Sequence, residues 1–380
     1  MSASLTSRPT KSVIDLDALA FNFRSVKSFI GDEIEYMAVV KADAYGHGAI
    51  ECSRRLSSEG IDWFGVALPE EGLQLREAGI DKPILCLGSF WLGQENLITE
   101  NQLTPVIYQS DKAKSLNQTA ESLGVTVDIH VKIDTGMGRI GVRFDEIETF
   151  AEQLTEFTNL NLDGLMTHFA TADDLHGNFT GLQINRFNDC VGNFRKKGFD
   201  PTYIDLANSP GAIAHPDARG NLVRLGGVLY GLGGDVLPAG IEKPDLVPVM
   251  AVRSEITQIK KVPKGESIGY GRTFFTKRDT VIASIPIGYH DGYARNLSNI
   301  GSLIVNGKLA TVVGRVSMDW VMIDVTDIDG AAVGTPVTII GSEQGVSIKA
   351  EDIAALLSTI SYEVTCGISA RVPRIFEEKL

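Results

Sequence analysis

The sequence predicts an α/β protein, with an N-terminal (β/α)8 barrel of the TIM type followed by a mainly antiparallel β-domain. Eight short apolar runs alternate with amphipathic segments over roughly the first 225 residues, which matches the strand count and length of such a barrel. From about Gly240 onward, tight turns separate runs in which polar and apolar residues partly alternate, as in antiparallel sheets. The 380 residues, 43% of them hydrophobic, suffice for two domains with large cores.

The elements of the barrel domain are expected in regular alternation. A short strand at 12–16 precedes a helix that Asp17 is expected to cap, because apolar residues then recur at near-helical spacing. The barrel strands are predicted at 36–40, 63–67, 84–87, 105–108, 127–133, 162–167, 203–206 and 222–225, with helices at 69–78, 111–123, 144–155 and 181–197. A doubly wound open sheet shows the same alternation and is the alternative fold.

The second domain is expected to be built from strands and one helix. We expect the barrel domain to span residues 1–240 and the β-domain residues 241–380, and the strand near 12–16 can pack with the β-domain. Strands are predicted at 249–261, 280–287, 303–305, 308–313, 320–325 and 336–340, and a helix at 349–357. The pair Asn306-Gly307 predicts a tight hairpin turn between two of these strands.

Composition excludes several classes of protein. A net charge of −13 argues against a nucleic-acid partner, which normally meets a basic face. The four cysteines include no C-x-x-C pair, so neither a zinc site nor an oxidising compartment is predicted. The first ten residues lack the apolar core of a signal peptide, and no apolar run reaches the ~18 residues of a membrane span. We therefore expect a cytoplasmic protein without metal or membrane partners.

The stretch Ala38–Gly48 places a lysine at the end of a buried strand. An apolar run ends at Lys41, and alanines and glycines then surround Asp43, Tyr45 and His47. Desolvation at such a position lowers the pKa of a lysine and makes its amine available as a nucleophile or base. Our hypothesis is that Lys41 forms a Schiff base with an aldehyde. The alternative is a surface lysine at a strand end.

Polar residues follow only some of the predicted barrel strands. In a barrel, chemistry gathers at the carboxyl ends of the strands, and here strands two, three and four end without candidate groups. Ser209 at a helix start and Gly226-Gly227 occupy the loops after strands seven and eight, the usual phosphate site of such barrels, unless they are plain turn residues. The other polar residues at the mouth are Lys41, Tyr45, His47, Lys132, Arg139, His168, Asn208 and Arg224.

These residues lie in motifs that resemble those of the alanine racemases, which are pyridoxal phosphate enzymes of fold type III. The resemblance begins at Ala38–Gly48 and runs in the family's order almost to the C-terminus. The further motifs are at 132–139, 166–170, 207–209, 223–224, 229–231, 269–273, 285–289, 314–319, 362–363 and 371–374. One departure is Ser317, which stands where cysteine is common and bears on substrate preference rather than on the reaction.

The resemblance implies a role for each matching residue. Around the cofactor it implies Lys41 as the Schiff-base lysine, Tyr45, Ser209, Tyr362 and the backbone of Gly226 and Gly227 as phosphate ligands, and Arg224 opposite the pyridine nitrogen. Around the substrate it implies Tyr270 as a second catalytic base that acts in the other subunit's site, with His168 as the link between Tyr270 and Arg224. It implies that the substrate is bound by Arg139, Met318 and Tyr289. Lys132, carbamylated in many members, and Asp319 are implied as supporting residues.

The implied reaction is interconversion of L- and D-alanine, which supplies D-alanine for peptidoglycan. Lys41 would serve one face of the substrate and Tyr270 the other, in a homodimer with shared sites. An arginine only donates hydrogen bonds, so Arg224 would keep the pyridine nitrogen neutral and discourage transamination. The alternatives are a broad-specificity racemase, for example of serine, a related barrel-type lyase or decarboxylase, and a non-catalytic pyridoxal phosphate carrier. The presence of Tyr270 argues against the carrier.

Overall fold

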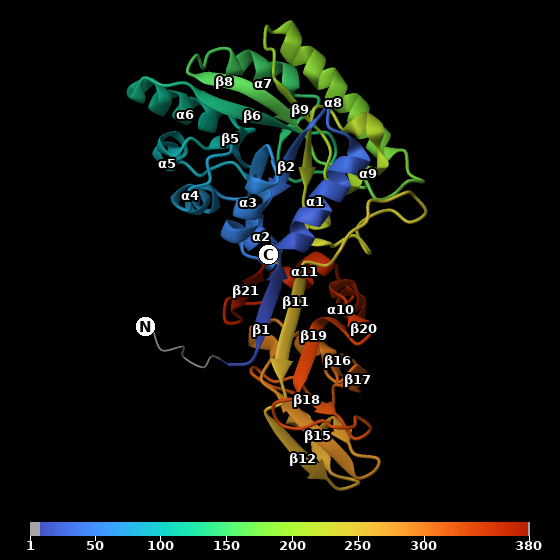
Figure 1. Ribbon diagram of the computed structural model, residues 1–380. Helices are drawn as coiled ribbons and strands as arrows, with labels where there is room; N and C mark the ends of the chain where they lie inside the picture. The colour runs from blue at the N-terminus through green and yellow to red at the C-terminus, as the bar shows by residue number, and fades with distance from the viewer. Residues whose placement is uncertain (1–7, 379–380) are drawn as a thin grey trace.

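The structure is a computed structural model that describes residues 8–378, arranged as two domains joined end to end (Figure 1). The helices and strands of the barrel occupy one end, and the strands of the second domain occupy the other. The outermost residues of both predicted domain ranges, and most of the segment on which the signal-peptide expectation depends, lie outside the described residues. Between residues 8 and 378, no helix combines the length and apolarity needed to cross a membrane.

Eight parallel strands form the barrel of the first domain. In order they are β2 (Glu35–Val39), β3 (Trp63–Val66), β4 (Ile84–Cys86), β5 (Thr104–Ile107), β6 (Val127–Asp134), β8 (Leu160–Met166), β9 (Tyr203–Asp205) and β10 (Leu222–Leu225). β10 pairs with β2. Two backbone hydrogen bonds close the other side, from Arg224 of β10 to Ala207 just after β9 (3.0 Å) and from Asn221 just before β10 to Ile204 of β9 (3.2 Å). The sheet therefore curls back on itself, and the open-sheet alternative is wrong. The predicted strand limits agree within two residues.

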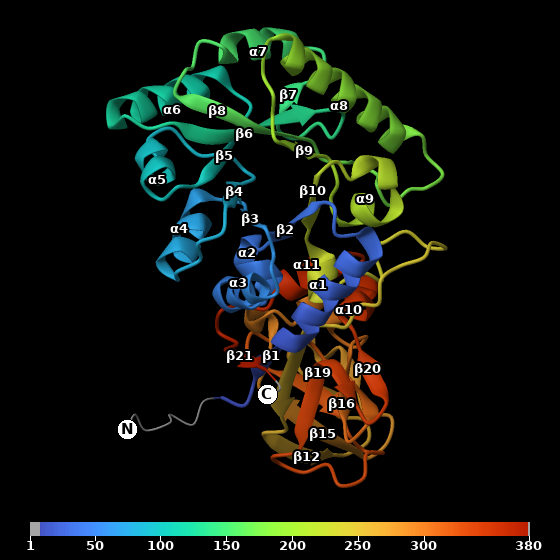
Figure 2. The same cartoon turned by 45° about the horizontal axis from the view of Figure 1, so that its top comes forward.

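Helices cover the outside of the barrel (Figure 2). They are α1 (Leu16–Ile30), α3 (Ala49–Ser58), α4 (Pro69–Glu77), α5 (Glu95–Glu100), α6 (Ser110–Leu123), α7 (Ile147–Leu154), α8 (Phe179–Lys196) and α9 (Ser209–Ala214), and the short strand β7 (Val142–Arg143) lies beside β6. The expected cap of α1 is corrected: Asp15 accepts from the backbone N–H of Ala18 at 2.8 Å, and Asp17 lies inside the first turn. α5 was not predicted because six residues are too few to show helical periodicity.

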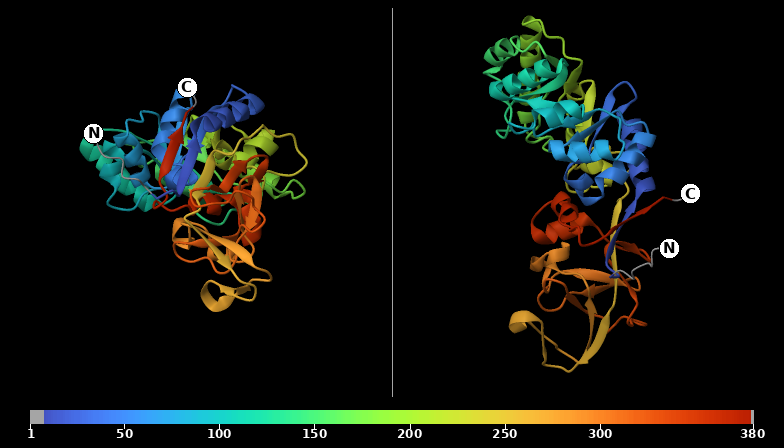
Figure 3. Two further views of the ribbon diagram at one scale, coloured as in Figure 1. Left: turned by 60° about the horizontal axis from the view of Figure 1, so that its bottom comes forward. Right: turned by 90° about the vertical axis from the view of Figure 1, so that its left-hand side faces the viewer.

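The strand β1 (Lys11–Asp15) belongs to the sheet of the second domain. It pairs with β11 (Met250–Glu255) in the antiparallel sense and with β21 (Arg374–Glu377) in the parallel sense, so the first and last strands of the described residues run side by side (Figure 3). The same sheet contains β16 (Ser302–Val305), β17 (Lys308–Thr311), β19 (Pro336–Glu343) and β20 (Val346–Ile348). A smaller sheet contains β12 (Gln258–Val262), β15 (Thr280–Ile285) and β18 (Val321–Asp324), and β13 (Ser267–Ile268) pairs with β14 (Phe274–Phe275).

Two expectations for the second domain need correction. The run at 249–261 is not one strand, because the chain leaves one sheet after β11 and enters the other at β12. A second helix, α11 (Ser361–Cys366), follows α10 (Ala350–Leu357). The hairpin turn is confirmed: Asn306 and Gly307 join β16 to β17 with φ of 48° and 70°, the left-handed conformation that a type I′ turn requires.

Two histidines of this fold are buried without solvent contact. His130 lies inside the barrel between the rings of Trp63 and Tyr203, and neither of its ring nitrogens has a hydrogen-bond partner. Burial, and then the charge of Arg224, lower the pKa of His130 to about 3. Burial lowers the pKa of His47 to about 4 in the same way. Both side chains are therefore neutral in the folded protein at any ordinary pH.

We predict that acid weakens the fold through these histidines. On unfolding each regains a pKa near 6.5, so below that pH the unfolded chain binds more protons and stability falls as the pH falls toward the folded-state value. At pH 5 the loss is about 2 kcal/mol for each histidine. Urea unfolding between pH 7 and 5 should show a shallower pH slope for His130→Gln than for the unsubstituted protein. His176→Gln, at an exposed position, should keep the full slope; equal slopes for the two variants would contradict the assignment.

Candidate active site

A cavity of about 630 Å³ opens at the mouth of the barrel and collects most of the predicted site residues. It is bounded by the carboxyl ends of the strands on one side and by α11 of the second domain on the other. The polar clustering expected from the strand ends is therefore present in the fold. The predicted residues that line the cavity are Lys41, Tyr45, Lys132, Arg139, His168, Ser209, Arg224, Gly226 and Tyr362.

The backbone after Lys41 forms a left-handed turn. Four successive residues of α2 (Lys41–Gly46) have φ between 54° and 55°, although none of them is glycine. This conformation costs about 1–2 kcal/mol per residue, so the surroundings must hold it. The ring of His47 does so by donating from Nδ1 to the carbonyl of Ala44 at 2.9 Å. His47 is thus a structural support of the turn, which directs both Lys41 and Tyr45 to the cavity.

Lys41 meets the electrostatic conditions expected of a nucleophilic amine. Its pKa is lowered, first by burial and then by the charge of Arg139, with Arg224 acting in the same direction. Glu71 and Cys366 oppose the shift without reversing it. A lowered pKa increases the fraction of neutral amine, which is the form that attacks a carbonyl or removes a proton. The surface-lysine alternative does not describe this position.

Arg224 is the most firmly held cation of the cavity. Its side chain is 3% exposed, and one guanidinium nitrogen donates to the carbonyl of Thr167 at 2.8 Å and approaches Nδ1 of His168 at 3.3 Å. An arginine only donates, so Nδ1 of His168 accepts and its proton is on Nε2. Burial, followed by the charges of Arg224, Lys132 and Arg139, lowers the pKa of His168 to about 2, so this imidazole is neutral.

Asp205 is a site residue that the sequence analysis missed. It lies at the end of β9 with no solvent exposure, and its Oδ1 pairs with Arg224. Its other oxygen, Oδ2, is buried and has no hydrogen-bond partner. The carboxylate offsets part of the positive charge of the neighbouring arginine and fixes the guanidinium plane. A carboxylate within the apolar strand pattern at 203–206 was the available signal.

Lys132 and Arg139 complete the cationic side of the cavity. Lys132 is 5% exposed, and burial followed by the charges of Arg224 and Arg139 lowers its pKa to about 7. Arg139 lies in the loop after β6, whose shape is held by Asp134: its Oδ1 accepts from the backbone N–H groups of Gly136 (2.9 Å) and Gly138 (3.1 Å). The cavity thus presents several cations and suits a ligand with more than one negative charge.

Hydroxyl groups and glycine backbone meet at one end of the cavity in what we call the phosphate cradle (Tyr45, Ser209, Gly226, Gly227 and Tyr362). Oγ of Ser209 accepts from the N–H of Gly226 at 2.9 Å. A Cβ atom at Gly226 would lie 2.7 Å from the Tyr45 hydroxyl, and one at Gly227 would overlap the ring of Tyr362. The rings of Tyr45 and Tyr362 pack edge to face at 5.2 Å. The glycines are therefore required by close approach and are not plain turn residues.

The loop at 231–235 brings Tyr362 to the barrel. Asp235 at its end accepts from the backbone N–H of Ser361 at 2.6 Å and from its hydroxyl at 2.8 Å. These bonds attach the first residue of α11 to the barrel mouth, and Tyr362 is the next residue. Gly234 of this loop also contacts the second domain, because its backbone N–H donates to Oε1 of Glu351 at 3.3 Å.

The remaining predicted residues lie outside the cavity, on the surface of the second domain. Tyr270 is 73% exposed, Met318 50% and Tyr289 42%. Asp319 is ion-paired with Arg371 at 2.7 Å. The structure therefore does not bring these four residues to the Lys41 cavity of their own chain. Within residues 8–378, no group of three or more His, Cys, Asp or Glu side chains could hold a metal ion.

The barrel mouth combines a lysine of lowered pKa with an anion site, and a β-domain covers it. These features define a class of two-domain barrel enzymes that depend on a lysine. Comparison with known families places the chain within this class. The family described as alanine racemase, N-terminal domain, matches residues 14–233, and the alanine racemase C-terminal domain matches residues 249–376. The chain belongs to the alanine racemase family and is an amino-acid racemase, which is an isomerase.

The chain is similar in sequence and in structure to alanine racemases over nearly its full length. The alanine racemase of Geobacter sulfurreducens is 43% identical over 98% of this chain and 98% of its own, and that of Halothermothrix orenii is 42% identical with the same coverage. The structure of the Bacillus anthracis enzyme with bound L-Ala-P has a TM-score of 0.93 at 35% identity, covering 99% of this chain and 96% of that one. The Bartonella henselae enzyme with covalently bound pyridoxal phosphate gives 0.87 at 28% identity, covering 98% and 100%.

Proposed function

We propose that this enzyme interconverts L- and D-alanine, using pyridoxal 5′-phosphate attached covalently to Lys41. The observation that supports this most directly is the meeting of Lys41, Arg224 and the phosphate cradle in one cavity. The full-length relatives that carry the name alanine racemase support alanine as the substrate. We further propose that the enzyme works in the cytoplasm and supplies D-alanine for cell-wall peptidoglycan.

The residues present fit the proposed cofactor. The lowered pKa of Lys41 suits an amine that bonds an aldehyde, and hydroxyls and glycine N–H groups at the cradle suit a phosphate dianion. Arg224 is held rigidly by Asp205 and can only donate, so it would face the pyridine nitrogen as a donor and leave that nitrogen unprotonated. When bound, pyridoxal phosphate would supply an electron sink that acidifies the α-proton of the amino acid.

Two residues of the chain would then move the proton. Lys41 would hold or release a proton on one face of the amino acid, and Tyr270 would do the same on the opposite face. His168 links the tyrosine to Arg224, and Arg139 receives the substrate carboxylate. Because removal and return occur on different faces, the chirality is inverted.

The exposure of Tyr270 supports a homodimer with shared sites. A catalytic tyrosine that is 73% exposed and outside its own cavity must meet substrate elsewhere, and the barrel mouth of a second copy is the proposed place. Tyr289 and Met318 would accompany it. We also propose that Lys132 is carbamylated, since about half of an amine with a pKa of about 7 is neutral at pH 7, and the neutral form reacts with carbon dioxide.

Racemisation can be tested directly. Incubating the protein and pyridoxal phosphate with L-alanine should bring the optical rotation to zero without release of carbon dioxide. The same assay on L-serine and a panel of other L-amino acids distinguishes an alanine enzyme from a broad-specificity racemase, which would act on them at comparable rates. Carbon dioxide release, or rotation that persists with L-alanine, would reject the proposal.

A further inference from the structure

The turn that carries Tyr289 is bonded to the segment that carries Met318. The backbone N–H of Tyr289 donates to the carbonyl of Ser317 at 3.0 Å, and that of His290 donates to the carbonyl of Met318 at 3.2 Å. A Cβ atom at Gly288 would overlap these same carbonyls, so only glycine permits the approach. The side chains of Tyr289 and Met318 are about half exposed, and their positions follow from how this joined backbone is held.

A buried carboxylate holds the turn from behind. Asp291 has no solvent exposure, and its Oδ2 accepts from the backbone N–H of Gly288 at 2.9 Å. An arginine meets each of its oxygens: Arg8 approaches Oδ2 at 2.6 Å and Nε of Arg371 donates to Oδ1 at 2.8 Å. Burial by itself would raise the pKa of Asp291, but the bonds from the two arginines outweigh it and the pKa is lowered. The carboxylate is therefore ionised and fixed on both sides.

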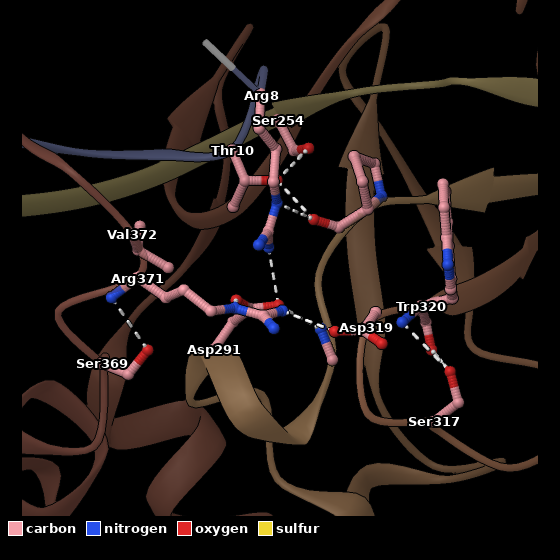
Figure 4. Close-up of polar contacts among 12 residues, drawn as sticks. Arg8, Thr10, Ser254, Asp291, Ser317, Asp319, Trp320, Ser369, Arg371 and Val372 are labelled. Carbon is pink, nitrogen blue, oxygen red and sulfur yellow. Dashed lines mark hydrogen bonds and ion pairs between the residues drawn. The ribbon is translucent and has the colours of Figure 1, made fainter.

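The chain of charges continues to the Met318 segment. The outer nitrogen of Arg371 pairs with Asp319 at 2.7 Å, immediately after Met318 (Figure 4). Arg8, Asp291, Arg371 and Asp319 thus alternate in sign and sum to zero charge. We call these four residues the ion chain.

The N-terminal segment anchors the ion chain to the main sheet. Nε of Arg8 and the hydroxyl of Thr10 both donate to the carbonyl of Pro286, at 2.9 and 2.6 Å, and that residue begins the turn of Tyr289. The Thr10 hydroxyl also lies 2.8 Å from Oγ of Ser254 on β11 (Figure 4). Three remote parts of the chain therefore converge on one short turn.

Stability alone does not account for this arrangement. Exposed ion pairs contribute little, and buried ones only about offset their own desolvation. The ion chain instead fixes the position of the backbone, because each of its ion pairs ends on the turn of Tyr289 or on the segment of Met318. Under the proposed function, Tyr289 and Met318 are the residues that contact the substrate bound in the partner subunit.

We infer that the ion chain positions Tyr289 and Met318 for the substrate bound in the partner subunit's barrel. Arg8, Asp291, Arg371 and Asp319 are positioning residues, since none of them lines the Lys41 cavity. The N-terminal Arg8–Thr10 segment is thereby part of the active-site machinery, although it contacts no substrate. The inference rests on the proposed function.

The first test separates positioning from folding. Arg8→Met keeps the apolar stem and leaves Asp291 paired with Arg371; we expect KM for L-alanine to rise about tenfold, with a smaller change in kcat. The visible absorbance of bound pyridoxal phosphate and the dimer mass should be unchanged. Arg8→Lys, which restores the charge, should recover part of the loss, and Asp319→Asn should resemble Arg8→Met. Arg278→Met removes an exposed arginine–aspartate pair of the same domain and should leave KM unaltered.

The second test asks whether the ion chain acts on the other subunit. In a dimer of one Lys41→Ala chain and one Arg8→Met chain, the intact barrel receives Tyr289 from a chain with a complete ion chain, so KM should be normal. When both substitutions are on one chain and its partner is unsubstituted, the intact barrel receives the weakened turn, and KM should be raised. Equal KM values in the two mixed dimers, or loss of cofactor absorbance together with activity, would overturn the inference. An unsubstituted protein that fails to racemise alanine would instead reject the proposed function.

Discussion

Replacing Lys41 with alanine is expected to abolish racemisation and covalent cofactor attachment together. The substitution removes the amine that the fold desolvates at the end of β2, and the other lysine lining the cavity, Lys132, lies on a different strand, β6. We expect kcat to fall by about 10⁴-fold or more, since the residue acts both in attachment and in proton transfer. The measurements are racemisation of L-alanine and the visible absorbance after dialysis.

A buried lysine outside the cavity provides the matched control. Lys112 is 6% exposed, its pKa is also lowered by burial, and its ammonium lies 5.0 Å from the ring centroid of Trp91, outside the cavity. Lys112→Ala should retain absorbance and activity even if it lowers stability. Added methylamine should restore part of the activity of Lys41→Ala, because the missing group is an amine. Undiminished absorbance in Lys41→Ala after dialysis would remove Lys41 from its role.

The barrel was predictable because its signals are local. Each strand is an apolar run bounded by a helix of contrasting period, and so the predicted limits agree within two residues. Lys41 could be singled out for the same reason, as a charge at the end of such a run. The left-handed turn after it was not predictable, because Ala-Asp-Ala-Tyr contains no glycine to announce positive φ. That turn is imposed by its packing, including the bond from His47.

Contacts between remote residues set the limit of the prediction. Asp205 looks like part of an ordinary strand until closure of the barrel brings β9 beside Arg224 of β10. Arg8 and Asp291 are 283 positions apart, and no local pattern connects them. Tyr270 and Met318 were found only through resemblance, since their exposed positions have no signal in hydrophobic periodicity. The role of such a residue depends on the structure of the neighbouring chain, which the pattern of its own chain does not describe.

Mixing two inactive variants is expected to restore activity if the sites are shared. Lys41→Ala lacks the base of its own barrel, and Tyr270→Phe lacks the hydroxyl that its second domain would give to the partner; the phenol loss alone should cost about 10²–10⁴-fold. In a mixed dimer, the barrel of the Tyr270→Phe chain keeps Lys41 and meets an intact Tyr270 from the other chain. One site is complete and the other lacks both groups.

Purified mixed dimers, selected with two different affinity tags, should therefore show about half of the unsubstituted activity, because one of two sites is restored. The opposite arrangement, with both substitutions on one chain and an unsubstituted partner, leaves each site lacking one group and should be nearly inactive. A dimer of two differently tagged Lys41→Ala chains controls for contamination. If both residues acted within one chain, the outcome would reverse: the double variant with an unsubstituted partner would be half active, and the mixture of single variants would be inactive.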